Sequence, residues 1–148
     1  MIDILLAGAC GLYCGACGIY RMYKDQDTKR LEQAAREVFH CRPEDICCEG
    51  CRGPLDCRWS PQCQILACTR ERGLTFCHEC TDFPCDDLSA FSADHRDIPL
   101  TNLHRLAEIG LEAWLAEQET RWCCPACGKP VDIYSKACRA CGAELPKR

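Results

Sequence analysis

Pairs of cysteines in metal-ligand spacing are the chemically most informative feature of this chain. Cysteine accounts for 18 of the 148 residues. Near the C-terminus, Cys124 and Cys127 form one CxxC pair, and Cys138 and Cys141 form a second pair after ten intervening residues. Zn²⁺ prefers four ligands in a tetrahedron, and two such pairs supply four thiolates. The spacing therefore predicts a zinc site at these four cysteines; Cys123 could replace Cys124, but it lacks the two-residue spacing to Cys127.

A zinc ribbon is the structure expected around this site. Gly128 and Gly142 each follow the second cysteine of a pair, where the turn favours a positive φ. Residues 131–134, with the sequence VDIY, are typical of a strand. We therefore expect residues 121–148 to form a zinc-ribbon β-hairpin, with a disulfide pair or a single iron ion at the four thiols as alternatives.

Residues 10–85 contain a second and larger set of candidate metal ligands. Three more CxxC pairs occur there, with single thiols between and beside them. Eleven or twelve thiolates suit two or three tetrahedral sites, and a third site could use His40 or His78 or keep an open position at which zinc activates water. The candidate ligands are Cys10, Cys14, Cys17, Cys48, Cys51, Cys57, Cys63, Cys68, Cys77, Cys80 and Cys85, with Cys41 and Cys47 as reserves.

The first three cysteines of this set also fit other chemistry. Cys10, Cys14 and Cys17 have the cluster-binding spacing of radical S-adenosylmethionine enzymes. Those enzymes need a large barrel of alternating strands and helices, which this chain does not predict, and Ala16 stands where they usually carry an aromatic residue. A plain [4Fe–4S] cluster with a fourth cysteine from elsewhere and a dithiol redox pair at Cys14 and Cys17 remain alternatives.

The segments between the cysteines predict helices with a thin hydrophobic core. Helices are expected to start near Cys17, near Thr28, at Pro61 behind an N-cap at Ser60, at Pro84 and near Thr101. The last is expected to run through Gly110 to Leu115, because apolar residues recur there every three or four positions. We therefore expect a small, metal-stabilised, mainly α-helical domain with irregular cysteine-rich loops over residues 1–120, followed by the ribbon.

The distribution of charge and the expected cellular compartment exclude further classes of protein. Residues 1–120 carry 12 Lys and Arg against 20 Asp and Glu, whereas residues 121–148 carry six against two. An acidic body does not favour nucleic acid, so we do not expect a nucleic-acid partner. The acidic start and the short apolar run before Cys10 do not resemble a secretory signal, and no membrane helix is expected. We expect a cytoplasmic protein, where reducing conditions favour bound metal over disulfides.

Three stretches resemble a known family of small cysteine-rich prokaryotic proteins. They are residues 10–20 (CGLYCGACGIY), residues 49–53 (EGCRG) and residues 68–85, which end in CHECTDFPC. The family is catalogued only as a domain of unknown function, and some members end in a zinc ribbon. The resemblance covers about residues 8–120. It implies a metal-binding role for the eleven candidate ligands between Cys10 and Cys85, and it implies no reaction.

Three functions follow from these observations. The leading hypothesis is a multi-metal protein, binding mainly zinc, that acts as a structural module in contact with a protein partner. The second is an iron–sulfur protein for electron transfer or redox sensing. The third is an enzyme with an open zinc site or a reactive thiolate, for which Cys14 is the candidate nucleophile.

Overall fold

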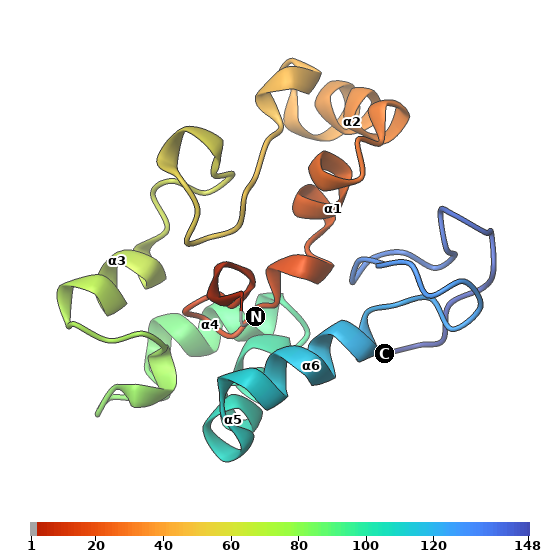
Figure 1. The fold of residues 1–148 in the computed structure, drawn as a ribbon. Helices are drawn as coiled ribbons and strands as arrows, with labels where there is room; N and C mark the ends of the chain where they lie inside the picture. The colour runs from red at the N-terminus through yellow and green to blue at the C-terminus, as the bar shows by residue number, and fades with distance from the viewer. Residues whose placement is uncertain (1–2) are drawn as a thin grey trace.

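Six α-helices joined by cysteine-rich loops make up the protein, in a computed structural model that describes residues 3–148 (Figure 1). The helices are α1 (Gly18–Lys24), α2 (Thr28–Ala34), α3 (Gln64–Glu71), α4 (Asp86–Asp94), α5 (Ile98–Ile109) and α6 (Leu111–Arg121). Short 3₁₀ turns occupy Ile4–Leu6, Cys14–Ala16, Pro43–Asp45, Leu55–Cys57 and Cys77–Glu79, and a π turn at Ala35–Phe39 prolongs α2. The prediction of a mainly helical protein is confirmed. None of the described helices has the length and apolar character needed to cross a bilayer.

The predicted C-terminal β-hairpin is wrong. Across residues 3–148, β pairing is limited to isolated bridges, and none of them extends into a strand. Two bridges lie in the C-terminal segment, Cys123 with Pro130 and Ala137 with Glu144. Residues 131–134 turn instead of extending, because the Asp132 carboxylate accepts hydrogen bonds from the backbone N–H groups of Tyr134 (2.9 Å) and Ser135 (3.0 Å).

The hydrophobic core joins the N-terminal turn to the last three helices. Trp114 of α6 is fully buried, and the Tyr13 ring meets it edge-on with 6.2 Å between ring centroids. This pair belongs to a cluster of ten buried residues: Ala7, Cys10, Tyr13, Ala16, Phe76, Leu88, Leu103, Leu106, Trp114 and Trp122. In Figure 1 the red N-terminal turn accordingly lies beside α4, α5 and α6. The first candidate ligands are therefore built into the core.

A buried amide and a glycine fix this N-terminal turn against α5. The Asn102 side chain donates a 2.8 Å hydrogen bond to the carbonyl of Gly11, and Asn102 is only 3% exposed. Gly11 has a φ of 91°, and a Cβ there would overlap the carbonyl oxygen of Pro99 and lie 2.8 Å from Leu103 Cγ. The loop approaches the helix so closely that only glycine fits.

Several helix boundaries differ from the sequence-based expectation, and α4 and α5 begin at Asp86 and Ile98 rather than at Pro84 and near Thr101. The long C-terminal helix is interrupted at Gly110, whose φ of 82° separates α5 from α6. Glycine adopts this left-handed conformation without the steric cost that a Cβ brings, so the break directs α6 back across α5. The helix expected from Pro61 begins later, at Gln64, with Cys63 in place of Ser60 at the N-cap.

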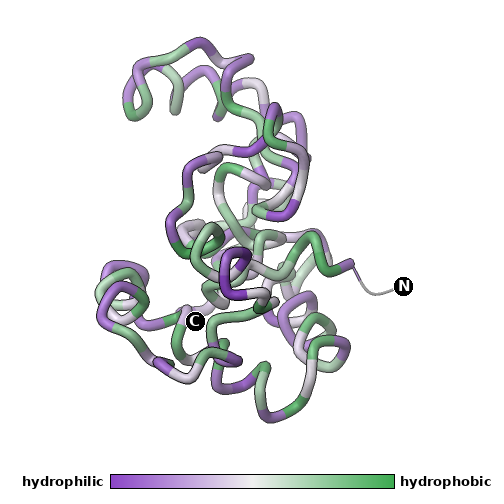
Figure 2. The backbone as a smooth tube through the Cα atoms, turned by 90° about the vertical axis from the view of Figure 1, so that its left-hand side faces the viewer, coloured by the Kyte–Doolittle hydropathy of each residue, from purple (hydrophilic) through white to green (hydrophobic). Residues whose placement is uncertain are grey.

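Helix α2 extends away from the core. None of its residues is buried, and it follows an N-cap in which the Asp27 carboxylate accepts from Arg30 N–H at 3.1 Å. Figure 2 shows this upper part of the molecule mostly in purple and pale colours, whereas green segments gather nearer the middle. The helix is therefore held by its cap and its neighbours rather than by apolar burial.

Truncation of Trp114 tests the core. Trp114→Ala should cost about 3–5 kcal/mol, because it removes a fully buried ring and leaves a cavity. Thermal unfolding followed by circular dichroism measures the loss. Val38→Ala is the control, because Val38 is 63% exposed and its truncation should change stability by no more than about 0.5 kcal/mol. Equal effects of the two substitutions would contradict this core.

A pair of glycine substitutions tests the contact between the N-terminal turn and α5. Gly73→Ala should cost only the backbone strain of a left-handed residue, about 1–2 kcal/mol, because a Cβ at this φ of 69° meets no atom within 4 Å. Gly11→Ala should lower the melting temperature much further, since it adds the overlap with Pro99. Similar melting temperatures for the two variants would show that the turn does not pack closely on α5.

Candidate metal centres

The four C-terminal cysteines converge on one point. The sulfur atoms of Cys124, Cys127, Cys138 and Cys141 all lie within 4.8 Å of one another. Cys124 Sγ and Cys141 Sγ are 3.7 Å apart, and Cys127 Sγ and Cys138 Sγ are 3.6 Å apart. A tetrahedron with metal–sulfur bonds of about 2.3 Å has edges of about 3.8 Å. The four thiols can therefore hold a single tetrahedral metal ion without rearranging the chain.

Two cysteine turns with the same backbone pattern build this site. In the first turn, Cys124 N–H donates to Lys129 O (2.9 Å) and Gly128 N–H donates to Cys124 O (2.8 Å). The second turn repeats this, since Cys138 N–H donates to Ala143 O (2.8 Å) and Gly142 N–H donates to Cys138 O (2.8 Å). The two glycines have φ values of 74° and 77°, as the sequence predicted.

Backbone N–H groups favour the thiolate form of Cys138 on the inner, apolar side of the site. The pKa of Cys138 is lowered to about 6, chiefly because the backbone N–H of Cys141 donates to its sulfur. Val131 and Leu145 pack around the buried Cys124 and Cys138 in a small hydrophobic cluster separate from the main core. Cys127 and Cys141 are exposed. Each turn therefore contributes one buried and one exposed sulfur.

Two of the N-terminal CxxC pairs lie against each other. The thiols of Cys14 and Cys51 are hydrogen-bonded, and Cys17 interacts electrostatically with Cys48 and Cys51. The hydrogen bond to Cys51 and burial raise the pKa of Cys14, whereas the same hydrogen bond lowers the pKa of Cys51 to about 7. The structure thus brings one pair from the N-terminal turn to a second pair from the loop before α3.

A second N-terminal group surrounds Cys77. Its thiol interacts electrostatically with the four other cysteines of the segment 63–85, namely Cys85, Cys68, Cys80 and Cys63. Cys10 lies between the two groups, since it interacts with Cys51, Cys63 and Cys77. Burial raises the pKa of both Cys10 and Cys77 to about 12, so a metal cation at these sulfurs would offset the cost of ionising them. Among residues 3–148, however, only the C-terminal four sulfurs meet within 4.8 Å.

Cys57 is separated from both groups and lies beside Cys47, a reserve candidate, whose Sγ donates to Asp56 O at 3.7 Å. The neighbouring Cys57 thiol raises the pKa of Cys47 to about 11. The backbone N–H of Glu49 donates to Cys57 O at 2.9 Å and closes the loop that brings these thiols together.

Two arginines hold the cysteine-bearing segments, and the sequence analysis missed both. Arg52 donates from Nε to Ala7 O (2.7 Å) and from Nη2 to Thr75 O (2.6 Å), so it ties three distant segments together. Arg72 donates from Nη1 to Cys80 Sγ at 3.1 Å. Arg52 directly follows the candidate ligand Cys51 in the sequence. A cation next to a thiol is the sequence signal from which the role of Arg52 could have been predicted.

Glu79 and the histidines near the clusters have packing and capping contacts. The Glu79 carboxylate accepts from the backbone N–H groups of Thr75 (2.7 Å) and Phe76 (3.1 Å), which fixes the turn that carries Cys77. His78 stacks on Phe76 with 5.8 Å between ring centroids. His40 ends the π turn in a left-handed conformation. Glu79 thus has a capping contact, His78 a stacking contact and His40 a position at a helix end.

The fold and its thiol groups define a small helical cysteine-rich protein with a tetrathiolate site. Residues 6–90 match the family described as "Protein of unknown function (DUF3795)", and the chain belongs to that family. The match covers the two N-terminal thiol groups and ends before the C-terminal site. Neither the curated proteins nor the solved structures contain a match to this chain.

A pair of neighbouring cysteines tests the register of the C-terminal site. Cys124→Ser should abolish tight metal binding at this site, because its sulfur is one of the four converging ligands. Cys123→Ser is the matched control: the Cys123 thiol donates to Thr120 O at 3.1 Å and is not among the four. Metal content by elemental analysis should fall by one ion per chain in the first variant alone. If Cys123→Ser lost the ion instead, the fourth ligand would be Cys123 rather than Cys124.

Proposed function

We propose that this chain is a zinc-binding protein of the cytoplasm whose metal–thiolate sites organise a surface for contact with a protein partner. The observation that carries the proposal is the convergence of Cys124, Cys127, Cys138 and Cys141, with sulfur pairs 3.6 and 3.7 Å apart. Four thiolates in tetrahedral arrangement are the ligand set typical of structural zinc. A closed set of this kind leaves no position for substrate, which supports a structural role.

The size of the C-terminal site supports a single ion over a cluster. In a [4Fe–4S] cluster each cysteine binds a different iron, so the four cysteine sulfurs lie farther apart than they do around a single metal ion. The two sulfur–sulfur distances of 3.6 and 3.7 Å are instead close to the edge of a tetrahedron around one ion, which is about 3.8 Å. Zinc is the expected occupant because thiolates bind it strongly and it needs no redox partner.

The N-terminal cysteines are proposed to form two further tetrathiolate sites. The first would use Cys14, Cys17, Cys48 and Cys51, which repeat the two-pair pattern of the C-terminal site. The second would draw on Cys68, Cys77, Cys80 and Cys85, with Cys10 and Cys63 beside them. Support comes from the contacts within each group and from the buried thiols, whose ionisation a cation would favour.

Three further observations support the cytoplasmic location and the protein partner in this proposal. None of the 18 cysteines, all of which lie among residues 3–148, forms a disulfide, which agrees with a reducing compartment. Val38, Leu55 and Tyr134 are each more than 60% exposed and lie outside both hydrophobic clusters, so they are available to a protein partner. The acidic balance of residues 1–120 favours a protein over nucleic acid.

Metal analysis of the full-length chain, purified without oxygen, tests this function. We expect stoichiometric zinc, a colourless protein, and loss of helical circular dichroism on complete chelation, because the thin core depends on the metal. A brown protein with iron and sulfide absorption would instead support the iron–sulfur hypothesis. A well-folded natively produced chain without bound metal, or full helicity after chelation, would contradict the proposal.

A second pair of cysteine variants tests the N-terminal sites. Cys80→Ser should lose one metal ion and much of the helical signal, because Cys80 belongs to the group around Cys77 and accepts from Arg72. Cys41→Ser should keep the full metal content, since Cys41 lies outside the proposed ligand sets. Equal metal content in both variants would remove Cys80 from the ligands.

A further inference from the structure

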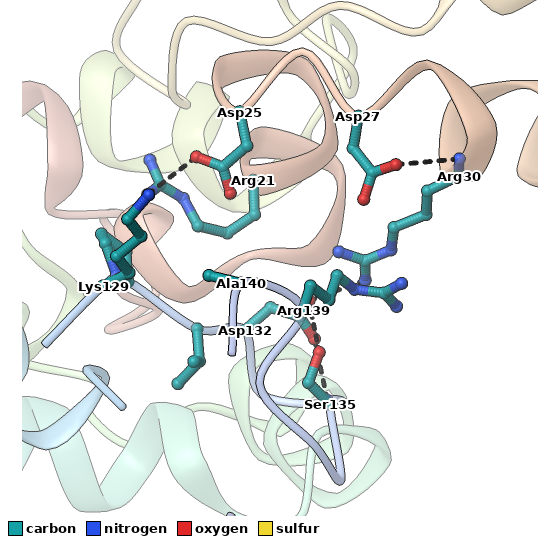
Figure 3. A pocket seen from close by; sticks show the side chains of 11 residues that line it. Arg21, Asp25, Asp27, Arg30, Lys129, Asp132, Ser135, Arg139 and Ala140 are labelled. Atoms are coloured by element: carbon teal, nitrogen blue, oxygen red, sulfur yellow. Dashed lines mark hydrogen bonds and ion pairs between the residues drawn. The ribbon is translucent and has the colours of Figure 1, made fainter. Parts of the chain in front are cut away.

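A charged pocket lies between the first two helices and the C-terminal cysteine turns (Figure 3). Its volume is about 480 Å³, which is within the range of small-molecule sites. Arg21 and Arg30 enter it from α1 and α2, and Lys129 and Arg139 enter it from the two cysteine turns. Four cations thus converge from parts of the sequence that are about a hundred residues apart.

The pocket also contains three carboxylates, and two of them are engaged in holding the fold. Asp132 is 3% exposed and accepts from Arg30 Nη2 (2.7 Å), Ser135 Oγ (2.9 Å) and the backbone of the turn that it forms. Asp27 accepts from the backbone N–H of Arg30 as the N-cap of α2. Four cations against three carboxylates leave one positive charge in excess, in a protein whose net charge is −4.

Several of the cations have unused hydrogen-bonding capacity. The Arg21 side chain is 12% exposed, and its buried Nε has no hydrogen-bond partner among the described residues. Its contact with Asp25 is long, at 3.5 Å, and Asp25 is half exposed. Within residues 3–148, no carboxylate forms an ion pair with Lys129 or Arg139. Buried donors without acceptors are costly, so an anion in this pocket would be favoured.

We propose that this pocket binds the phosphate group of a small ligand through Arg21, Lys129 and Arg139. Guanidinium groups present parallel N–H donors that match phosphate oxygens, and a lysine adds a point charge. Figure 3 shows Arg21 and Lys129 on one side of the pocket and Arg139 on the other, with Arg30 beside it. Arg30 stays paired with Asp132 and contributes charge to the phosphate rather than a freed side chain. The volume accommodates a phosphate monoester of nucleotide size.

Metal and phosphate should be coupled at this pocket. Lys129 follows the glycine of the first cysteine turn, and Arg139 lies between the two cysteines of the second turn. A metal ion at the four sulfurs therefore fixes the backbone that carries both cations. This coupling rests on the proposed metal-binding function, whereas the phosphate site itself rests on the arrangement of the cations. By linkage, phosphate should also slow the loss of metal from the cysteine turns.

Calorimetric titration of the full-length, metal-loaded chain with inorganic phosphate and with adenosine 5′-monophosphate tests the site. We expect saturable binding of one ligand per chain that weakens as salt is added. Tighter binding of the monophosphate would identify a phosphate ester as the ligand, whereas equal binding would identify free phosphate. Absence of binding by both probes at millimolar concentration would overturn the proposal. Binding only of a single-stranded oligonucleotide would overturn the small-ligand assignment.

Two variants in the same C-terminal segment control for general charge. Arg139→Gln removes a pocket cation and should weaken binding about tenfold or more, because a hydrogen bond to a charged group is lost. Lys136→Gln removes the same charge outside the pocket and should change affinity by less than about twofold. Both variants should retain the metal content of the parent chain. Equal weakening in the two variants would show non-specific attraction and would overturn the site.

Removal of metal separates this inference from the proposed function. If the chain holds stoichiometric metal, chelation should weaken phosphate binding, and unchanged affinity after chelation would overturn the coupling. If the chain holds no metal, the proposed function fails, and phosphate binding by the chain as purified still decides whether the pocket is an anion site. The two failures are therefore distinguished by one elemental assay and one titration.

Discussion

The energetic cost of burying thiols is the constraint on which the rest of this structure depends. Cys10 and Cys124 lie in the two hydrophobic clusters, and Cys14 is also buried, at positions where an ordinary small protein would place aliphatic side chains. A buried thiol packs as a small apolar group, but it resists ionisation because thiolate is poorly solvated there. A bound cation would reverse that preference. Metal binding and core formation would then be one equilibrium rather than two successive events.

The N-terminal turn connects the apolar core to the thiol groups. One side of this turn carries Tyr13 and Ala16 into contact with the last helices, and the other carries Cys14 and Cys17 to the loop before α3. Arg52 then joins that loop to the segment before Cys77 by two carbonyl contacts. The helices therefore do not simply surround the cysteine-rich loops. Their packing determines where the first candidate ligands, Cys10, Cys14 and Cys17, lie along the N-terminal turn.

Local patterns in the sequence predicted most helices and the four converging C-terminal thiols, whereas contacts between distant residues escaped them. CxxC spacing and the following glycines act within a few residues, so Cys124 and its partners could be found from the sequence alone. Strand character at residues 131–134 was overridden by a single carboxylate, that of Asp132, whose pairing with Arg30 depends on tertiary structure. The apolar periodicity across Gly110 suggested one helix, because periodicity shows which side of a helix is buried. It does not show that the backbone at Gly110 has a positive φ and ends the helix there. The grouping of the N-terminal cysteines needed three-dimensional information, since three pairs there share the same CxxC spacing and the other thiols are single.

The asymmetric exposure of the C-terminal sulfurs gives that site a preferred direction of ligand exchange. Cys124 and Cys138 are enclosed by Val131 and Leu145, whereas Cys127 and Cys141 face solvent. An incoming thiol or a small chelator would therefore reach a bound ion from the side of Cys127 and Cys141 and would displace these two sulfurs first. The two buried sulfurs would stay attached during the first steps of substitution. Such one-sided access would let a bound ion exchange quickly even where the equilibrium strongly favours retention.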